Sequence, residues 1–367
     1  MTPPESGTSL PEVPAAPETA PALTCLGCGA RLTYLPGTRS LTCEYCGTRN
    51  EISDSGKSIR EIDYNRFLEE QYAAEERMDV VTVRCGGCGA TVTLDPNVTS
   101  DRCPYCSTAL VVAGGSTSRM LKPHALVPFQ VDLKHARASF RRWLGGLWFA
   151  PSDLKRKARR DALAGVYVPY WTYDAATTNI YAGERGEHYT VMERNSSGQM
   201  RQVRRTRWMP AAGQIEVSFD DVLVSACRSL ETSQIRRLEP WHLQQLEPFQ
   251  EDYLRGFRAQ AYEVELTTGM ETARRIMENQ IRAAVRQDIG GDEQRIHSLD
   301  TTMRNVTFKH VLLPVWVSAF RYNDKVYRFL INGQTGEVQG KRPYSWFKII
   351  GLLLGIAAAI FILTAVL

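Results

Sequence analysis

Eight of the nine cysteines occur as four Cys-x-x-Cys pairs, and this pattern constrains the fold more than any other feature of the chain. Fourteen residues separate the two pairs of each set. The first set is Cys25, Cys28, Cys43 and Cys46, and the second is Cys85, Cys88, Cys103 and Cys106. A tight turn at each pair aims two sulfurs at one metal ion, and a short hairpin brings the second pair opposite the first. The spacing predicts two zinc ribbons, each closing a tetrahedral shell around one structural Zn²⁺.

The two cysteine sets repeat one module. Each cysteine of the second set lies sixty residues after its counterpart, and residues 24–48 match residues 84–108 at 12 of 25 positions. The matches include Tyr45 and Tyr105. A glycine follows the second cysteine of three pairs, at Gly29, Gly47 and Gly89. A positive φ at such a position lets backbone N–H groups turn back toward the sulfurs. We interpret the pattern as an internal duplication.

The same cysteines suit other chemistry as well. The cytoplasmic location expected from the C-terminal segment described below disfavours disulfides. A thioredoxin-like redox site is disfavoured too, because it needs one Cys-x-x-Cys at a strand-to-helix junction and this chain has four such pairs in register. Iron bound by the same thiolates is the alternative to zinc. The ninth cysteine, Cys227, lies in an apolar segment and is interpreted as a small buried hydrophobic residue.

The two ends of the chain differ in character. Residues 1–23 contain six prolines and no apolar run, which predicts a disordered Pro-rich tail. Residues 349–367 contain no charge, and as a helix they would be about 28 Å long. Lys341, Arg342 and Lys348 precede this segment. We therefore expect a single-pass, tail-anchored membrane protein whose N-terminal bulk is cytoplasmic, with Tyr344 and Trp346 as interfacial anchors. The alternative is a buried C-terminal helix.

The fold class predicted is a multi-domain chain with two zinc ribbons joined by a helix, an α+β domain with antiparallel sheet, and one transmembrane helix. The spacer helix is expected because Ile59, Ile62, Phe67 and Tyr72 occur near helical spacing within residues 58–79. The predicted divisions are a tail (1–23), ribbon 1 (24–50), a spacer helix (51–83), ribbon 2 (84–112), a linker (113–119), the α+β domain (120–345) and the membrane helix (346–367).

Within the α+β domain, alternating β-branched and aromatic residues predict strands that turn at Gly183 and Gly186. A long hairpin follows around residues 195–198, and then a mainly helical section. Its clearest helix is expected over residues 269–289, ending at Gly290-Gly291, after which the chain returns to strands with turns at residues 323–324 and 332–333.

Residues 166–171 and 311–316 share three apolar residues, a proline, a variable residue and a tryptophan, which suggests a second, diverged duplication. The prolines, Pro169 and Pro314, predict edge or bulge positions. We expect Trp171 and Trp316 to be core anchors, an aromatic ligand cage being the alternative.

Sequence motifs for catalysis are lacking, since the chain has no HExxH, GxSxG or complete P-loop. We therefore expect no enzyme activity. Acidic residues at Asp220-Asp221, Asp288, Asp292 and Glu293 would suit acid pairs or a cation, but turn and cap roles are favoured. The 44 basic and 40 acidic residues leave a net charge of only +4, which excludes a strong overall field for polyanions. Two basic clusters, residues 154–161 and 201–207, would suit anionic lipid, nucleic acid or a solvated surface.

Several blocks of the sequence carry a family resemblance: WFAPSDLKRKAR, GVYVPYWTYDA, FDDVLVSA, TFKHVLLPVW and YRFLINGQTGEVQGKRPYSW. Across residues 24–348 the chain resembles a bacterial family of zinc-ribbon membrane proteins, whose members are often labelled primosomal protein N′ or superfamily II helicase. This chain lacks the helicase motor. Some relatives are encoded beside flotillin-like and phage-shock-protein-A-like proteins, which implies a role in membrane stress or in recruiting such scaffolds. Only the eight cysteines carry over from the family as functional residues.

Together these features predict a non-enzymatic membrane adaptor that presents a cytoplasmic binding surface to membrane-associated proteins, with anionic lipid head groups as a further partner. The alternative is a nucleic-acid-binding accessory factor tethered at the membrane. An enzyme with an unrecognised site is a third class.

Overall fold

The computed structural model describes residues 24–69, 76–93, 100–106, 108–111, 116–151, 163–194, 196, 198–322, 325–341 and 344–366. The predicted Pro-rich tail, the basic cluster at 154–161 and the predicted turn at 323–324 lie outside these residues, as do two of the four residues of the predicted turn at 195–198.

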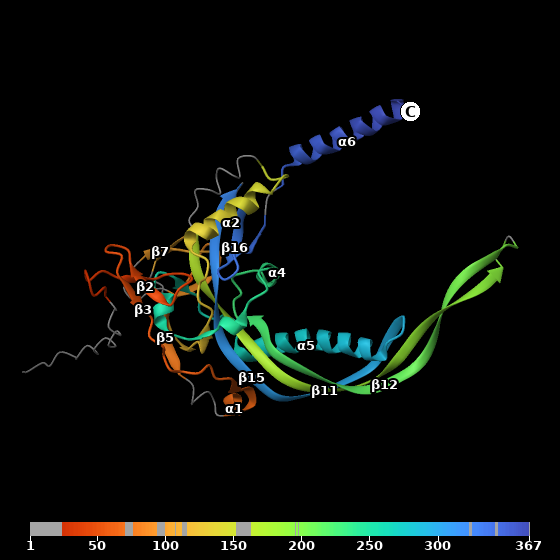
Figure 1. Cartoon of the computed structure of the whole chain (residues 1–367), viewed down its shortest axis with the longest axis horizontal. Coiled ribbons are helices and arrows are strands. Elements are labelled where there is room, and N and C mark those ends of the chain that lie inside the picture. The colour runs from red at the N-terminus through yellow and green to blue at the C-terminus, as the bar shows by residue number, and fades with distance from the viewer. Residues whose placement is uncertain are drawn as a thin grey trace, which may run out of the picture.

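The centre of the molecule is a sheet built on two long antiparallel neighbours, β11 and β15 (Figure 1). The strands of this sheet are β4 (Ile62–Asp63), β10 (Ala125–Leu126), β11 (Ala164–Arg194), β12 (Met200–Ser225), β13 (Glu247–Pro248), β14 (Arg258–Ala259), β15 (Glu293–Tyr322), β16 (Lys325–Asn332) and β17 (Val338–Gly340). Beyond the body, β11 and β12 continue as the predicted hairpin and form a two-stranded arm (Figure 1). Hairpin and antiparallel sheet are thus confirmed.

The described helices are α1 (Tyr64–Glu69), α2 (Leu133–Gly145), α4 (Thr232–Arg236), α5 (Leu266–Ile289) and α6 (Trp346–Val366), with single turns η2 (Leu243–Gln245) and η3 (Glu251–Leu254). Helix α5 buries one apolar stripe against the sheet because apolar residues recur every three or four positions, as at Met270, Ala273 and Met277. It ends where Gly290 adopts φ 66°. The prediction over 269–289 is confirmed, with a start three residues earlier.

The core has two equivalent units, β10–α2–β11–β12 and β14–α5–β15–β16. Strand β10 pairs in parallel with β15, and β14 pairs in parallel with β11. The indole of Trp171 donates to the carbonyl of Val264 at 2.8 Å, two residues before α5, and the indole of Trp316 donates to the carbonyl of Val131 at 2.8 Å, two residues before α2. Both tryptophans are therefore buried anchors that fix the start of a helix on the sheet.

The two prolines lie inside central strands, so the expectation of edge positions is wrong. On the side away from β15, β11 pairs first with β14, through Val166 and Tyr167, and then with β12 from Tyr170 onward. Pro169 lies in the gap between the two partners, and Pro314 lies in the matching gap of β15 between β10 and β16. A missing N–H costs nothing where no strand is present to accept it.

The predicted turns at Gly183 and Gly186 are also wrong, because β11 runs through both glycines without turning. A β carbon added at Gly183 would lie 2.0 Å from the carbonyl oxygen of Arg295 on β15. The pairing of β11 with β15 shifts register at this point. Gly183 therefore permits a close approach of two backbones at a bulge. A glycine inside a strand can serve this purpose instead of marking a turn.

Among the described residues of the predicted spacer helix, Tyr64–Glu69 form a helix, α1, and residues 70–75 lie outside the described residues. Residues 62–63 form β4, which pairs with β15, and a strand begins at Arg77. Tyr64 and Phe67 of α1 pack on Phe308 of the central sheet. Burial on the sheet outweighs the helical spacing of the apolar residues. Similarly, residues 116–119 of the predicted linker belong to a strand, residues Ser116–Leu121.

Candidate metal centres

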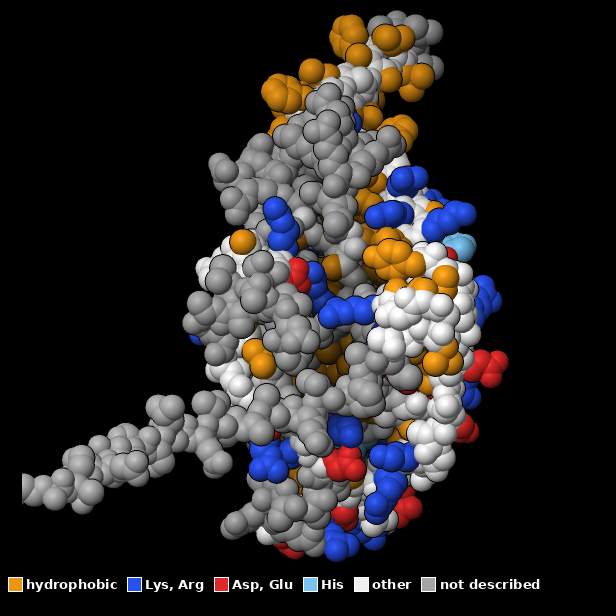
Figure 2. Space-filling view, turned by 90° about the vertical axis from the view of Figure 1, so that its left-hand side faces the viewer, with side chains coloured by type: hydrophobic (Ala, Val, Ile, Leu, Met, Phe, Trp, Pro, Cys, Tyr) orange, Lys and Arg blue, Asp and Glu red, His pale blue; other side chains and the backbone are white. Residues whose placement is uncertain are grey.

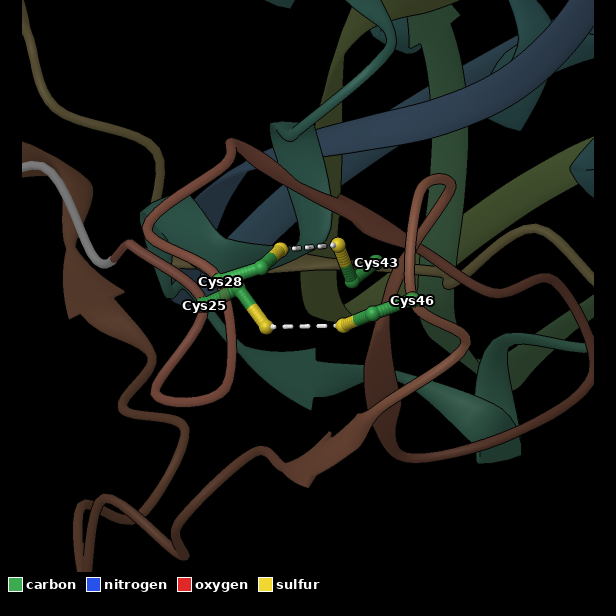
Figure 3. Close-up of side chains that lie close together, drawn as sticks. All are labelled: Cys25, Cys28, Cys43 and Cys46. Carbon is green, nitrogen blue, oxygen red and sulfur yellow. Dashed lines mark hydrogen bonds between the residues drawn. The ribbon is translucent and has the colours of Figure 1, made fainter.

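The first cysteine set converges as predicted. Ribbon 1 is built on β1 (Leu32–Tyr34), β2 (Ser40–Cys43) and β3 (Arg49–Glu51), which form one antiparallel sheet. The Sγ atoms of Cys25 and Cys46 lie 3.4 Å apart, and those of Cys28 and Cys43 lie 3.5 Å apart (Figure 3). A tetrahedral zinc site with Zn–S bonds of about 2.3 Å has sulfurs about 3.8 Å apart, whereas a disulfide needs about 2.05 Å.

The second set has the same geometry. Ribbon 2 is built on β5 (Arg77–Arg84), β6 (Thr91–Thr93), β7 (Ser100–Arg102), β8 (Ala109–Val111) and β9 (Ser116–Leu121). The Sγ atoms of Cys85 and Cys106 lie 3.4 Å apart, and those of Cys88 and Cys103 lie 3.6 Å apart. In both sets all four sulfurs lie within 4.8 Å of one another. Each set can therefore hold zinc or another metal ion that prefers sulfur.

The turns that carry the cysteines have the predicted backbone conformation, and in ribbon 1 a threonine side chain favours one thiolate. Gly29, Gly47 and Gly89 adopt φ values of 72°, 72° and 75°, as the sequence predicts. The Thr48 hydroxyl lies 3.1 Å from Cys46 Sγ, and its hydrogen bond lowers the pKa of that thiol to about 6. Thr108 lies 3.2 Å from Cys106 Sγ in the equivalent place. A lower thiol pKa favours the deprotonated ligand that a metal ion requires.

Four sulfur ligands fill a tetrahedral shell, so a metal held here has no open position for water or substrate. Its contribution is to tie two turns together and so to hold the ribbon folded. A bound metal in either ribbon would be structural.

Both ribbons pack on the central sheet, on opposite faces. Ribbon 1 contributes Leu32, Tyr34 and Leu41 to the cluster that contains Tyr167. Ribbon 2 contributes Val83 and Val92, among others, to the cluster that contains the neighbouring Val166 and Val168. Successive residues of a strand point to opposite faces. The ribbons are therefore parts of the body and not separate appendages.

The duplicated tyrosines differ most between the ribbons. Tyr105 is 0% exposed and donates a hydrogen bond to Gln260, and its carbonyl accepts a hydrogen bond from Arg328 at 2.9 Å. Tyr45, at the equivalent position of ribbon 1, is 86% exposed, and Leu26 on the facing turn is 91% exposed. Ribbon 2 thus docks on the body through its second metal-binding turn, which carries Tyr105, while ribbon 1 presents the equivalent turn to solvent. Alignment of the two ribbon sequences pairs Tyr45 with Tyr105 but does not predict that one is exposed and the other buried.

The acidic residues do not form one site. Asp288 accepts a hydrogen bond from the Tyr181 hydroxyl at 2.5 Å, and Asp292 accepts one from the backbone N–H of His188 at 2.7 Å. Oxygens of Glu61, Asp174 and Asp220 approach within 4.8 Å of one another. The ammonium of Lys309 pairs with Glu61 and Asp174, and its charge therefore already compensates two of these three carboxylates.

Cys227 is buried, and its Sγ lies 3.1 Å from Oε1 of Gln260. Burial raises the pKa of this thiol to about 11, which keeps it protonated and unreactive. It stands apart from both metal centres, as its apolar surroundings in the sequence predict.

The basic cluster at 201–207 lies on the β12 strand of the arm. Its four arginines are exposed, and three of them have neighbours within the arm. Arg204 contacts His188, Arg205 pairs with Glu193, and Arg207 stacks over the ring of Tyr189. These contacts describe a solvated, internally compensated surface.

Helix α6 is long and apolar enough to cross a membrane, with a mean hydropathy of 2.4 over Trp346–Thr364. None of that window is buried against the rest of the protein. Figure 2 shows apolar side chains covering the helix where it projects from the body. The alternative of a buried C-terminal helix is therefore wrong, and an exposed apolar helix of this length suits a bilayer core.

Among known proteins, the chain is similar to the uncharacterized protein YdjG of Bacillus subtilis (strain 168). The two are 26% identical over 352 residues, which covers 92% of this chain and 94% of the relative. No protein-family model and no solved structure matches the chain.

Proposed function

We propose that this protein is a non-enzymatic membrane adaptor, anchored by α6 with its ribbons in the cytoplasm, that uses the exposed turns of ribbon 1 to bind a membrane-associated protein. Two structural zinc ions would hold the ribbons folded. The family resemblance suggests flotillin-like or phage-shock-protein-A-like scaffolds as the partner class.

The observation that carries the proposal is the exposure of Leu26 and Tyr45. Large apolar side chains that are 91% and 86% exposed on two adjacent turns are typical of interaction sites. The turn of ribbon 2 that is equivalent to the Tyr45 turn already makes such a contact inside this chain, where Tyr105 is fully buried. The module is therefore capable of docking through this face.

The arm supports a second candidate function, nucleic-acid binding, because β12 carries four exposed arginines between residues 201 and 207. Three of them already have partners in the arm. Phosphate contacts would have to replace these interactions, which makes this function less favoured than protein docking.

The test is purification of the full-length protein in mild detergent under reducing conditions, followed by binding to purified flotillin-like and phage-shock-protein-A-like proteins. We expect binding that tolerates high salt and is lost in a Leu26→Ser/Tyr45→Ser variant. Zinc content and thermal stability should not change in this variant, since both positions are exposed. A matched control, Met192→Ser/Met200→Ser, alters exposed apolar residues of the arm and should bind normally.

Two outcomes would contradict the proposal. Equal binding by the ribbon 1 variant would remove Leu26 and Tyr45 from the interface. Steeply salt-dependent binding of RNA or DNA, abolished by Arg201→Gln/Arg204→Gln, would favour the nucleic-acid function instead.

A further inference from the structure

One tryptophan outside α6 is exposed beside the start of that helix. The loop of residues 146–150 follows α2, and within it Leu147 and Ala150 are buried while Trp148 is 79% exposed. The buried side chains of Leu147 and Ala150 fix the position of the loop. The exposure of a large indole on this loop has no role in packing the core.

Two hydrogen bonds fix this loop to the first turn of α6. The backbone N–H of Ser345 donates to the carbonyl of Phe149 at 2.7 Å. The ammonium of Lys348 donates to the carbonyl of Ala150 at 2.7 Å. Trp148 is therefore held at the level of residues 345–348, where the apolar segment begins. Figure 1 shows α2 leading toward this end of α6.

The surroundings have the composition of a membrane interface. Tyr344, Trp346 and Phe347 at the start of α6 are 57%, 71% and 89% exposed. Arg141 and Arg142 are exposed on the last turn of α2, immediately before the loop. Tryptophan and tyrosine favour the level of the lipid head groups, and arginine favours anionic head groups.

We propose that the loop at 146–150 is a second membrane contact, in which Trp148 enters the head-group layer of a bilayer containing anionic phospholipid. The loop is hydrogen-bonded to the start of α6, and Arg141 and Arg142 supply the complementary charge. This contact rests on the proposed anchoring by α6. It would fix how the body, and with it the exposed turns of ribbon 1, is oriented over the membrane, because one span alone allows rotation about its axis.

The test uses the full chain reconstituted into vesicles of phosphatidylcholine and phosphatidylglycerol, with tryptophan emission quenched by phosphatidylcholine brominated near the head group. Of the seven tryptophans, we expect Trp148 and Trp346 to lie within reach of the quencher. In Trp148→Phe six tryptophans remain, and of these only Trp346 is expected to be within reach. We expect the quenched fraction of the emission to fall by about 40% in Trp148→Phe. A matched control, Trp208→Phe on the arm, should leave the quenched fraction undiminished. Arg141→Gln/Arg142→Gln should reduce Trp148 quenching to its value in vesicles of phosphatidylcholine alone.

The outcomes separate this inference from the anchoring on which it rests. Removal of the protein from the vesicles by alkaline carbonate, together with unquenched Trp346, would contradict the anchor itself. Retention with quenched Trp346 and an unchanged signal in Trp148→Phe would overturn only the loop contact and would point to a protein partner for Trp148. A loss of quenching in Trp148→Phe, but not in Trp208→Phe, would support the inference.

Discussion

The buried lysine of β15 offers a sharp test of how charges inside the central sheet are compensated. The ammonium of Lys309 lies 2.8 Å from Asp221, 3.1 Å from Glu61 and 3.7 Å from Asp174. The side chain of Lys309 is only 6% exposed, and those of Asp174 and Asp221 are 13% and 22% exposed. Burial by itself would lower the pKa of Lys309, but the hydrogen bond that its ammonium donates to Asp221 and the charge of Asp174 outweigh burial and raise it.

We expect Lys309→Met to lower the free energy of unfolding by about 3–5 kcal/mol, because it leaves two carboxylates of low exposure without their counter-ion. Glu61 is 47% exposed and can turn toward water. The control Glu61→Gln should therefore cost less than about 1 kcal/mol. Adding Asp221→Asn to Lys309→Met should recover part of the loss, because one uncompensated charge is removed.

The measurement is urea unfolding of the full chain in mild detergent at neutral pH, followed by far-ultraviolet circular dichroism. A loss below about 1 kcal/mol for Lys309→Met would refute the reasoning, since it would place the three carboxylates in contact with water. A loss as large for Glu61→Gln would show that the exposed partner, and not the buried pair, carries the interaction.

Three further predictions concern metal, pH and packing. The wild-type chain should contain two zinc ions by elemental analysis, Cys43→Ser one, and Cys43→Ser/Cys103→Ser none; unchanged content in the double variant would exclude both ribbons as the metal sites. Burial lowers the pKa of His310 to about 3, so the folded state keeps it neutral while the unfolded chain gains a proton below pH 6.5. Stability should fall as pH decreases, by about 1 kcal/mol between pH 7 and pH 5.5, and His310→Gln should abolish this component of the slope in urea titrations at the two pH values. A β carbon at Gly269 would lie 2.4 Å from the Tyr173 hydroxyl, so Gly269→Ala should lower the midpoint of thermal unfolding by an amount equivalent to about 1–3 kcal/mol, whereas Gly145→Ala, which meets no atom within 4 Å, should not.

The features that the sequence predicts correctly depend on short-range patterns. The cysteine spacing places four sulfurs together because each ribbon is closed by turns within about twenty residues of chain. The apolar stripe of α5, its stop at Gly290 and the β11–β12 hairpin are equally local. The length and composition of α6 indicate a membrane segment without reference to any other part of the chain.

Tertiary structure decided the features that join distant segments. Gly183 suggested a turn, but it serves a backbone contact with Arg295, more than a hundred residues away in the sequence. Ile62 suggested part of a spacer helix, but it lies in β4, where it pairs with Phe308 of β15.

Contacts with distant segments also make the two ribbons differ in the burial of their turns. Their sequences are similar enough to predict one fold and one metal shell for both, because ligand geometry is set within each module. Tyr105 is nevertheless buried and Tyr45 exposed, because only ribbon 2 meets Gln260 and Arg328 on the body. Which turns remain available to a partner depends on those long-range contacts, and no pattern within a ribbon records them.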